Sequence, residues 1–211
     1  MVSETGVDAF ILLFVVIDPI GVASLFCAIT QGYSAKAAQK TALRGVGIAY
    51  LLILAFTLGG GALLGYLGVT MAAFTVAGGI LLFLLAVDMV GVRQSGLRTA
   101  TESEQREAEQ KTDISVFPLA IPMIAGPGTL TTVLLLTGKH ENSATIFEVI
   151  AAVTMVLLVT LLMLLASRWI QALLGETGVN VIVRVFGIIL AALAVQYVSN
   201  GLHQLNLIGP G

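Results

Sequence analysis

The chain has 211 residues, of which 57% are hydrophobic and only 10% are charged, and its formal net charge is −2. A water-soluble domain carries about 25% charged residues, so this composition excludes a soluble globule and places most of the surface in lipid. The few charges do not form a basic patch along the chain, so nucleic-acid binding is not expected.

The apolar stretches predict six membrane-spanning helices, because a helix needs about 20 apolar residues to cross the bilayer core. The first runs from Ala9 to Ile29 and is interrupted only by Asp18. No charged residue occurs from 45 to 87, so two spans fit there, with a turn in "GYLGVT" (65–70). The last three spans are predicted at 114–138, 149–167 and 185–202.

Positively charged residues gather on one side of this arrangement, which predicts its orientation. Of the ten Lys and Arg residues, only Lys139 falls on the opposite side. The other nine lie in the first, third and fifth loops: Lys36, Lys40, Arg44, Arg93, Arg98, Arg106, Lys111, Arg168 and Arg184. Because cytoplasmic loops carry the excess of positive charge, we expect both termini to be extracytoplasmic.

The two halves of the chain show a weak internal repeat. A shift of 108 residues places Pro19 on Pro127 and lays residues 78–90 over 186–198. Three spans per half is an odd number, so the second half would enter the membrane from the opposite side, as in many secondary transporters. The predicted fold is therefore all-α, with two inverted three-helix repeats. We expect a first repeat at 1–91, a charged cytoplasmic loop at 92–113 and a second repeat at 114–211.

The first and fourth predicted spans each contain a proline near the bilayer midplane. Asp18-Pro19 interrupts the first span and Gly126-Pro127 the fourth. Proline lacks a backbone N–H and disfavours the helical conformation of the residue before it. Asp followed by Pro is also a helix-start signal, with Asp as the N-cap. We therefore expect both spans to be helices that are broken at mid-membrane.

The two breaks predict a polar site at mid-depth, because freed backbone groups are tolerated there only where protein or water covers them. The restarted half-helices place two N-termini near the centre, where a carboxylate can bind. Asp18 and freed carbonyls suit an ammonium group or a transient sodium ion or proton. Hydroxyl groups lie within about two helical turns of the breaks, on Ser24, Thr129, Thr131 and Thr132. In the structural alternative, Asp18 only caps a helix and Pro127 only shapes packing.

Three motifs resemble, in kind and order, those of the MarC family of six-span integral membrane proteins. They are "IDPIG" (17–21), "GGILLFLLAVDM" (78–89) and "PLAIPMIAGPGT" (118–129). The resemblance covers essentially the whole chain. It implies a place in the cell inner membrane and transport of small neutral amino acids, such as glycine and alanine, coupled to a cation gradient. Carried over by motif, the implicated positions are Asp18, Pro19, Gly21, Gly126, Pro127, Gly128 and Thr129.

The sequence departs from the family pattern directly after the first glycine. Family members often have Asn at the next position and Pro two residues later, whereas this chain reads Val22-Ala23-Ser24. If that Asn contributes to substrate binding, the substrate of this chain differs from that of other members. The candidate partners are a small solute, membrane lipid and a coupling cation, and glycine-rich faces such as 59–65 permit a homo-oligomer.

Three other functions compete with secondary transport. A passive small-solute channel uses similar half-helices but shows no concentrative uptake. A non-transporting scaffold or sensor is disfavoured because the chain has no sizeable soluble domain to carry a signal. An intramembrane aspartyl protease needs two aspartates that meet at depth, and Asp18 and Asp88 differ in expected depth by about half a bilayer. We therefore predict no catalytic residue, resident metal or cofactor.

Overall fold

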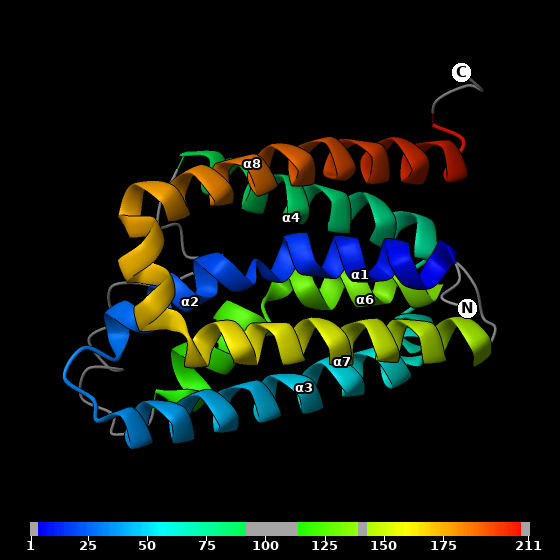
Figure 1. Cartoon of the computed structure of the whole chain (residues 1–211). Coiled ribbons are helices and arrows are strands. Elements are labelled where there is room, and N and C mark those ends of the chain that lie inside the picture. Colours follow the sequence, from blue (N-terminus) through cyan, green and yellow to red (C-terminus); the bar gives the residue numbers. More distant parts are fainter. Residues whose placement is uncertain (1–3, 92–113, 139–142, 208–211) are drawn as a thin grey trace.

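A computed structural model of the chain shows a bundle of helices whose axes are mostly parallel or antiparallel to one another (Figure 1). It describes residues 4–91, 114–138 and 143–207. The predicted loop at 92–113 and Lys139 lie outside this part of the chain. The helical segments are α1 (Glu4–Ile17), α2 (Pro19–Ile29), α3 (Ala35–Tyr66), α4 (Met71–Gly91), η1 (Ser115–Ile124), α6 (Pro127–Gly138), α7 (Ser143–Leu165) and α8 (Ser167–Gln204).

Five stretches of the described residues are helical, long and apolar enough to cross a membrane. The bent pair of η1 and α6 brings the number to six if the pair forms one span. The first stretch combines α1 and α2 over Gly6–Ile29, and the chain turns between α3 and α4 at 67–70, inside the predicted 65–70 turn. The prediction of an all-helical, multi-pass integral membrane protein is thus confirmed.

Helix α8 corrects one prediction, because it is longer than the predicted sixth span. The sequence predicts a loop from 168 to 184, whereas α8 is interrupted only at Gly175, whose φ of 62° and ψ of 178° are not helical. Val179 and Val183 lie four residues apart, on one face of the helix. Val179 is buried and Val183 packs against the core, so tertiary contacts keep this polar stretch helical.

Segment η1 is an irregular coil rather than a regular helix. Its backbone is extended at Phe117 (φ −131°, ψ 125°) and at Ile121 (φ −129°, ψ 126°). Each of these residues precedes a proline, which disfavours the helical conformation of its neighbour. The peptide bonds before Pro118 and Pro122 are cis. Segment η1 then meets α6 at an angle of 51°.

Helix α1 is central in the bundle (Figure 1). Leu13 and Ile17 belong to a buried apolar cluster with residues of α2, α3, η1 and α7, whereas Leu12 and Val16 belong to a second cluster with α4 and α8. Large apolar side chains stay exposed on the outer helices, for example Leu51 on α3 and Phe147 on α7. Such faces suit contact with lipid.

The remaining helices pack in pairs across the two halves of the chain. Helix α3 packs on α7 and α4 packs on α8, and the two members of each pair run in opposite directions (Figure 1). Glycines let α4 and α8 approach closely. A Cβ on Gly79 would lie 2.9 Å from the carbonyl oxygen of Ala194 and 2.8 Å from Cγ2 of Val198, and one on Gly187 would lie 2.9 Å from Cγ2 of Val90.

The α4–α8 contact predicts that Gly79→Ala lowers the melting temperature of the detergent-solubilised protein. The added methyl group would meet backbone atoms of α8, and overpacking of this kind costs about 1–3 kcal/mol. Gly61→Ala in α3 is the matched control, because a Cβ there meets no atom within 4 Å and alanine is the better helix former. Equal melting temperatures for the two variants would contradict the close contact.

Candidate functional site

Asp18 separates α1 from α2 near the middle of the first span. Its backbone is left-handed (φ 49°, ψ 71°), a conformation that Asp visits more readily than most residues. The Asp18 N–H donates to the Phe14 carbonyl at 2.9 Å, and the Val22 N–H donates to the Asp18 carbonyl at 3.0 Å. The Asp18 carboxylate accepts the Gly21 N–H at 3.1 Å and so caps α2, at whose first position Pro19 has no N–H to offer.

The Asp18 side chain is enclosed by protein, with 0% of its surface exposed. An ionisable group inside a membrane span is costly and is a functional candidate by default. Gly21 leaves the space that the carboxylate occupies, because a Cβ there would collide with Oδ2 of Asp18. The same Cβ would lie 3.2 Å from Val183, so α8 also covers this part of α2.

The second interruption lies between η1 and α6, at Ala125 and Gly126. A Cβ on Gly126 would collide with the carbonyl oxygen of Pro122, so the chain passes too close for any side chain. The buried Thr129 hydroxyl donates to the Ile124 carbonyl at 2.8 Å. The Thr129 side chain thus supplies a hydrogen bond to a carbonyl of the preceding segment, since Pro127 has no N–H that could donate.

Gly128 joins the two interruptions in space. A Cβ on Gly128 would lie 3.4 Å from Cγ1 of Val16 in α1 and 2.8 Å from Cδ2 of Leu85 in α4. Val16 comes two residues before Asp18, and Gly128 directly follows Pro127. The last turn of α1 and the first turn of α6 therefore pack against each other, and Asp18, Gly21, Pro127 and Gly128 share one region of the bundle interior.

Ser24 lies farther along α2, and its hydrogen-bond partner is distant in the sequence. Its hydroxyl donates to Oε1 of Gln171 at 2.9 Å, across 147 residues of sequence. The hydroxyls of Thr129 and Thr132 donate to nearby backbone carbonyls, that of Thr129 to Ile124 in η1 and that of Thr132 to Gly128 in α6 at 2.8 Å. Both oxygens can still accept a hydrogen bond, but neither donor is available to a ligand.

The described residues contain no group of three or more His, Cys, Asp or Glu side chains that could hold a metal ion. The chemistry that this region offers is therefore one enclosed carboxylate, two helix N-termini and several hydroxyl oxygens. Such a set suits a small ligand with both positive and negative charge.

The cap predicts different stabilities for two variants of Asp18. Asp18→Ala should lower the free energy of unfolding by about 1 kcal/mol, because alanine cannot accept the Gly21 N–H and disfavours the left-handed backbone. Asp18→Asn should keep most of the stability, since Asn caps helices equally well. Melting temperatures in one detergent measure both effects, and an equal loss in the two variants would show that the charge, rather than the cap, stabilises the fold.

Comparisons with known proteins agree over nearly the whole chain. Residues 4–206 match the MarC family of integral membrane proteins. The UPF0056 membrane protein YvbG of Bacillus subtilis is 35% identical over 94% of both chains, and a UPF0056 membrane protein of Archaeoglobus fulgidus is 35% identical over 93% of this chain and 91% of its own. The UPF0056 membrane protein YhcE of Escherichia coli is 29% identical over 93% of this chain and 91% of its own. No solved structure matches. This chain therefore belongs to the MarC family of integral membrane proteins.

Proposed function

We propose that this protein is a cation-coupled secondary transporter of small neutral amino acids, or of a similar small polar solute, across the cell inner membrane. The observation that carries the proposal is the enclosed Asp18 carboxylate at the interruption of the first span, beside the start of α6. A buried charge at a helix start in mid-span is expensive in lipid and suits a binding or coupling role.

The two helix starts would have different tasks. The N-terminus of α2 is already capped by Asp18, through the Gly21 N–H. The N-terminus of α6, at Pro127 and Gly128, is therefore the better place for a solute carboxylate. The solute ammonium group or the coupling cation would then bind at Asp18.

We infer that the halves at 1–91 and 114–211 are inverted repeats, each beginning with a span that is broken at mid-membrane. Exchanging α1 for η1, α2 for α6, α3 for α7 and α4 for α8 turns most packed pairs into other packed pairs. For example, α1–α7 becomes η1–α3, and α2–α8 becomes α6–α4. The shift of 108 residues also turns the Gly79–Val198 contact into the Gly187–Val90 contact. Reciprocal contacts of this kind support a two-fold relation between the halves.

The arrangement of the helix ends supports an orientation with both termini outside the cytoplasm. The beginning of α1 and the end of α8 lie at the same end of the bundle (Figure 1). The beginning of α3, which carries Lys36, Lys40 and Arg44, lies at the other end, as does the beginning of α8 with Arg168. Basic residues mark the cytoplasmic side of a membrane protein.

Alternating access fits the enclosure of Asp18 better than a passive channel does. A channel needs a continuous opening to the site, whereas Asp18 is 0% exposed. A transporter passes through such an enclosed state and reaches either side by movement of one repeat against the other. A scaffold would not need an enclosed carboxylate in mid-span.

Uptake into proteoliposomes tests this function. We expect labelled glycine, alanine or serine to accumulate when a sodium or proton gradient is imposed, and accumulation to fall at least about tenfold in Asp18→Asn, since one charge-assisted hydrogen bond is worth that factor. The Asn variant removes the charge but keeps the helix cap.

Glu176→Gln is the matched control for the loss of one acidic charge, because Glu176 is exposed on α8, after the interruption at Gly175. It should transport like the unmodified protein. Uptake that persists in Asp18→Asn would reduce Asp18 to a structural cap, and equilibration without accumulation would favour the channel. If the folded protein transports none of the three amino acids, the proposal that small neutral amino acids are its substrates is wrong.

A further inference from the structure

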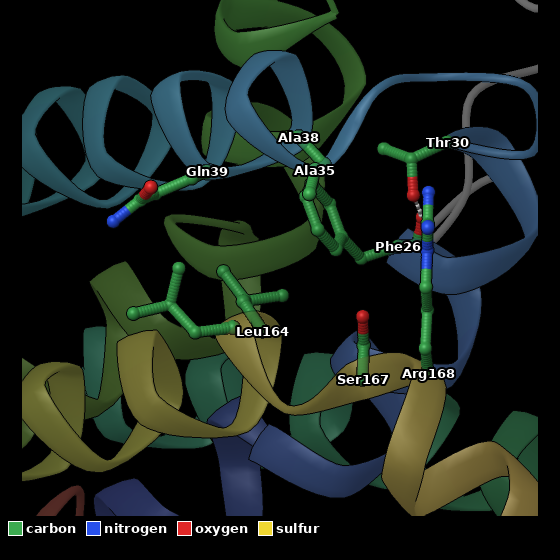
Figure 2. A pocket seen from close by; sticks show the side chains of 9 residues that line it. Phe26, Thr30, Ala35, Ala38, Gln39, Leu164, Ser167 and Arg168 are labelled. Carbon is green, nitrogen blue, oxygen red and sulfur yellow. Dashed lines mark hydrogen bonds between the residues drawn. The ribbon is translucent and has the colours of Figure 1, made fainter.

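A second polar site lies at the end of the bundle opposite to the beginning of α1 and the end of α8. A half-open cavity of about 290 Å³ lies there between the end of α2, the beginning of α3, the end of α7 and the beginning of α8. Figure 2 shows Phe26 in the middle of its wall, with Thr30 and Arg168 to one side. Phe26 comes eight residues after Asp18 on α2, so this cavity is separate from the interruption described above.

Arg168 supplies the positive charge of the cavity. Its Nη2 donates a hydrogen bond to the Tyr33 carbonyl oxygen at an N–O distance of 2.7 Å, and this bond holds the side chain along the cavity wall. A guanidinium group has five N–H donors, so four remain for other partners. Among the described residues that line the cavity, none is an Asp or Glu that would neutralise this charge.

Ser167 is the second polar group that borders the cavity. Its residue surface is only 4% exposed, and its hydroxyl forms no hydrogen bond within the described ranges. Figure 2 shows the hydroxyl pointing into the space between Phe26 and Arg168. No buried side-chain oxygen or nitrogen of the described residues lacks a hydrogen-bond partner, so the unpartnered Ser167 hydroxyl is accessible from the cavity and can donate to a ligand or to water.

The first turn of α8 adds backbone donors at the same place. Ala166, which precedes it, forms no side-chain hydrogen bond that would cap the helix. The N–H groups of an uncapped first turn have no partner within the helix, and they carry the positive end of the helix dipole. The apolar part of the lining includes Phe26 and Leu164.

We propose that this cavity binds the oxyanion of a small amphipathic molecule, a carboxylate or a phosphate, with Arg168 as its anchor and Ser167 as a second donor. A guanidinium group forms strong paired hydrogen bonds to both kinds of oxyanion. The apolar part of the molecule packs against Phe26 and Leu164. A soluble carboxylate and the phosphate of an anionic lipid headgroup share this chemistry. The inference does not depend on transport, because it concerns binding without a gradient.

Propionate is the probe for a soluble ligand. The whole protein in phosphatidylcholine nanodiscs is titrated with propionate by saturation-transfer NMR, and we expect saturable binding. Arg168→Gln and Ser167→Ala should each weaken it about tenfold, the loss for one hydrogen bond to a charged group. Ser167→Ala removes no protein hydrogen bond, so it tests the site even if Arg168→Gln unfolds.

One control variant locates the signal. Arg184→Gln removes an exposed positive charge from the same helix, so it should bind propionate like the unmodified protein. In a parallel arm, native mass spectrometry measures phosphatidylglycerol that stays bound after extraction. Retention that is lost in Arg168→Gln, but not in Arg184→Gln, would identify a lipid phosphate as the occupant.

The proposal is overturned if neither propionate nor phosphatidylglycerol binds. It is also overturned if Arg168→Gln and Ser167→Ala bind both probes like the unmodified protein. Propionate binding that is lost in Asp18→Asn and kept in both cavity variants would place the oxyanion at the mid-span site instead.

Discussion

Inside a bilayer, every backbone N–H and carbonyl group needs a partner, and this constraint decides where the chain can change direction. Pro19 and Pro127 each remove one donor from the middle of an apolar segment. At the first break the Asp18 carboxylate accepts the Gly21 N–H at the start of α2, and at the second the Thr129 hydroxyl donates to the Ile124 carbonyl. Both partners come from within five residues. These polar side chains in the bundle interior therefore satisfy backbone groups at the two breaks. Any role in ligand binding would come in addition to that structural role.

Close packing between helices brings the two breaks near each other. Gly128 lets the first turn of α6 lie against Val16, and Gly21 leaves room for the Asp18 carboxylate beneath α8. Glycines on α4 and α8 bring those helices together along the outer side of α1. In lipid no hydrophobic force drives helices together, so contacts between small residues carry much of the association. A methyl group at any of these contacts would separate elements that the interior region needs side by side.

The helices could be predicted from the sequence because their cause, apolar length, is local, and proline after Asp or Gly is a local helix-start signal. The extension of α8 through 176–184 could not, because Val179 and Val183 hold it helical only through contacts with the rest of the bundle. Ser24 was predicted as a site residue, but its partner Gln171 is 147 residues away. The cavity could not be predicted from the sequence either, since residues of four helices line it. In the sequence, Arg168 is only one of several basic residues in predicted loops.

Helix α2 connects the two polar regions of the molecule. It has 11 residues, its N-cap is the enclosed Asp18, and Phe26 near its end lines the cavity. Internal hydrogen bonds hold about three turns of this helix together, so we expect a displacement at one end to reach the other. Ser24 also ties it to the first part of α8, which carries Ser167 and Arg168. Opening a path to Asp18 by moving α2 would therefore reshape the cavity wall, and a ligand held between Phe26 and Arg168 would act on the position of α2.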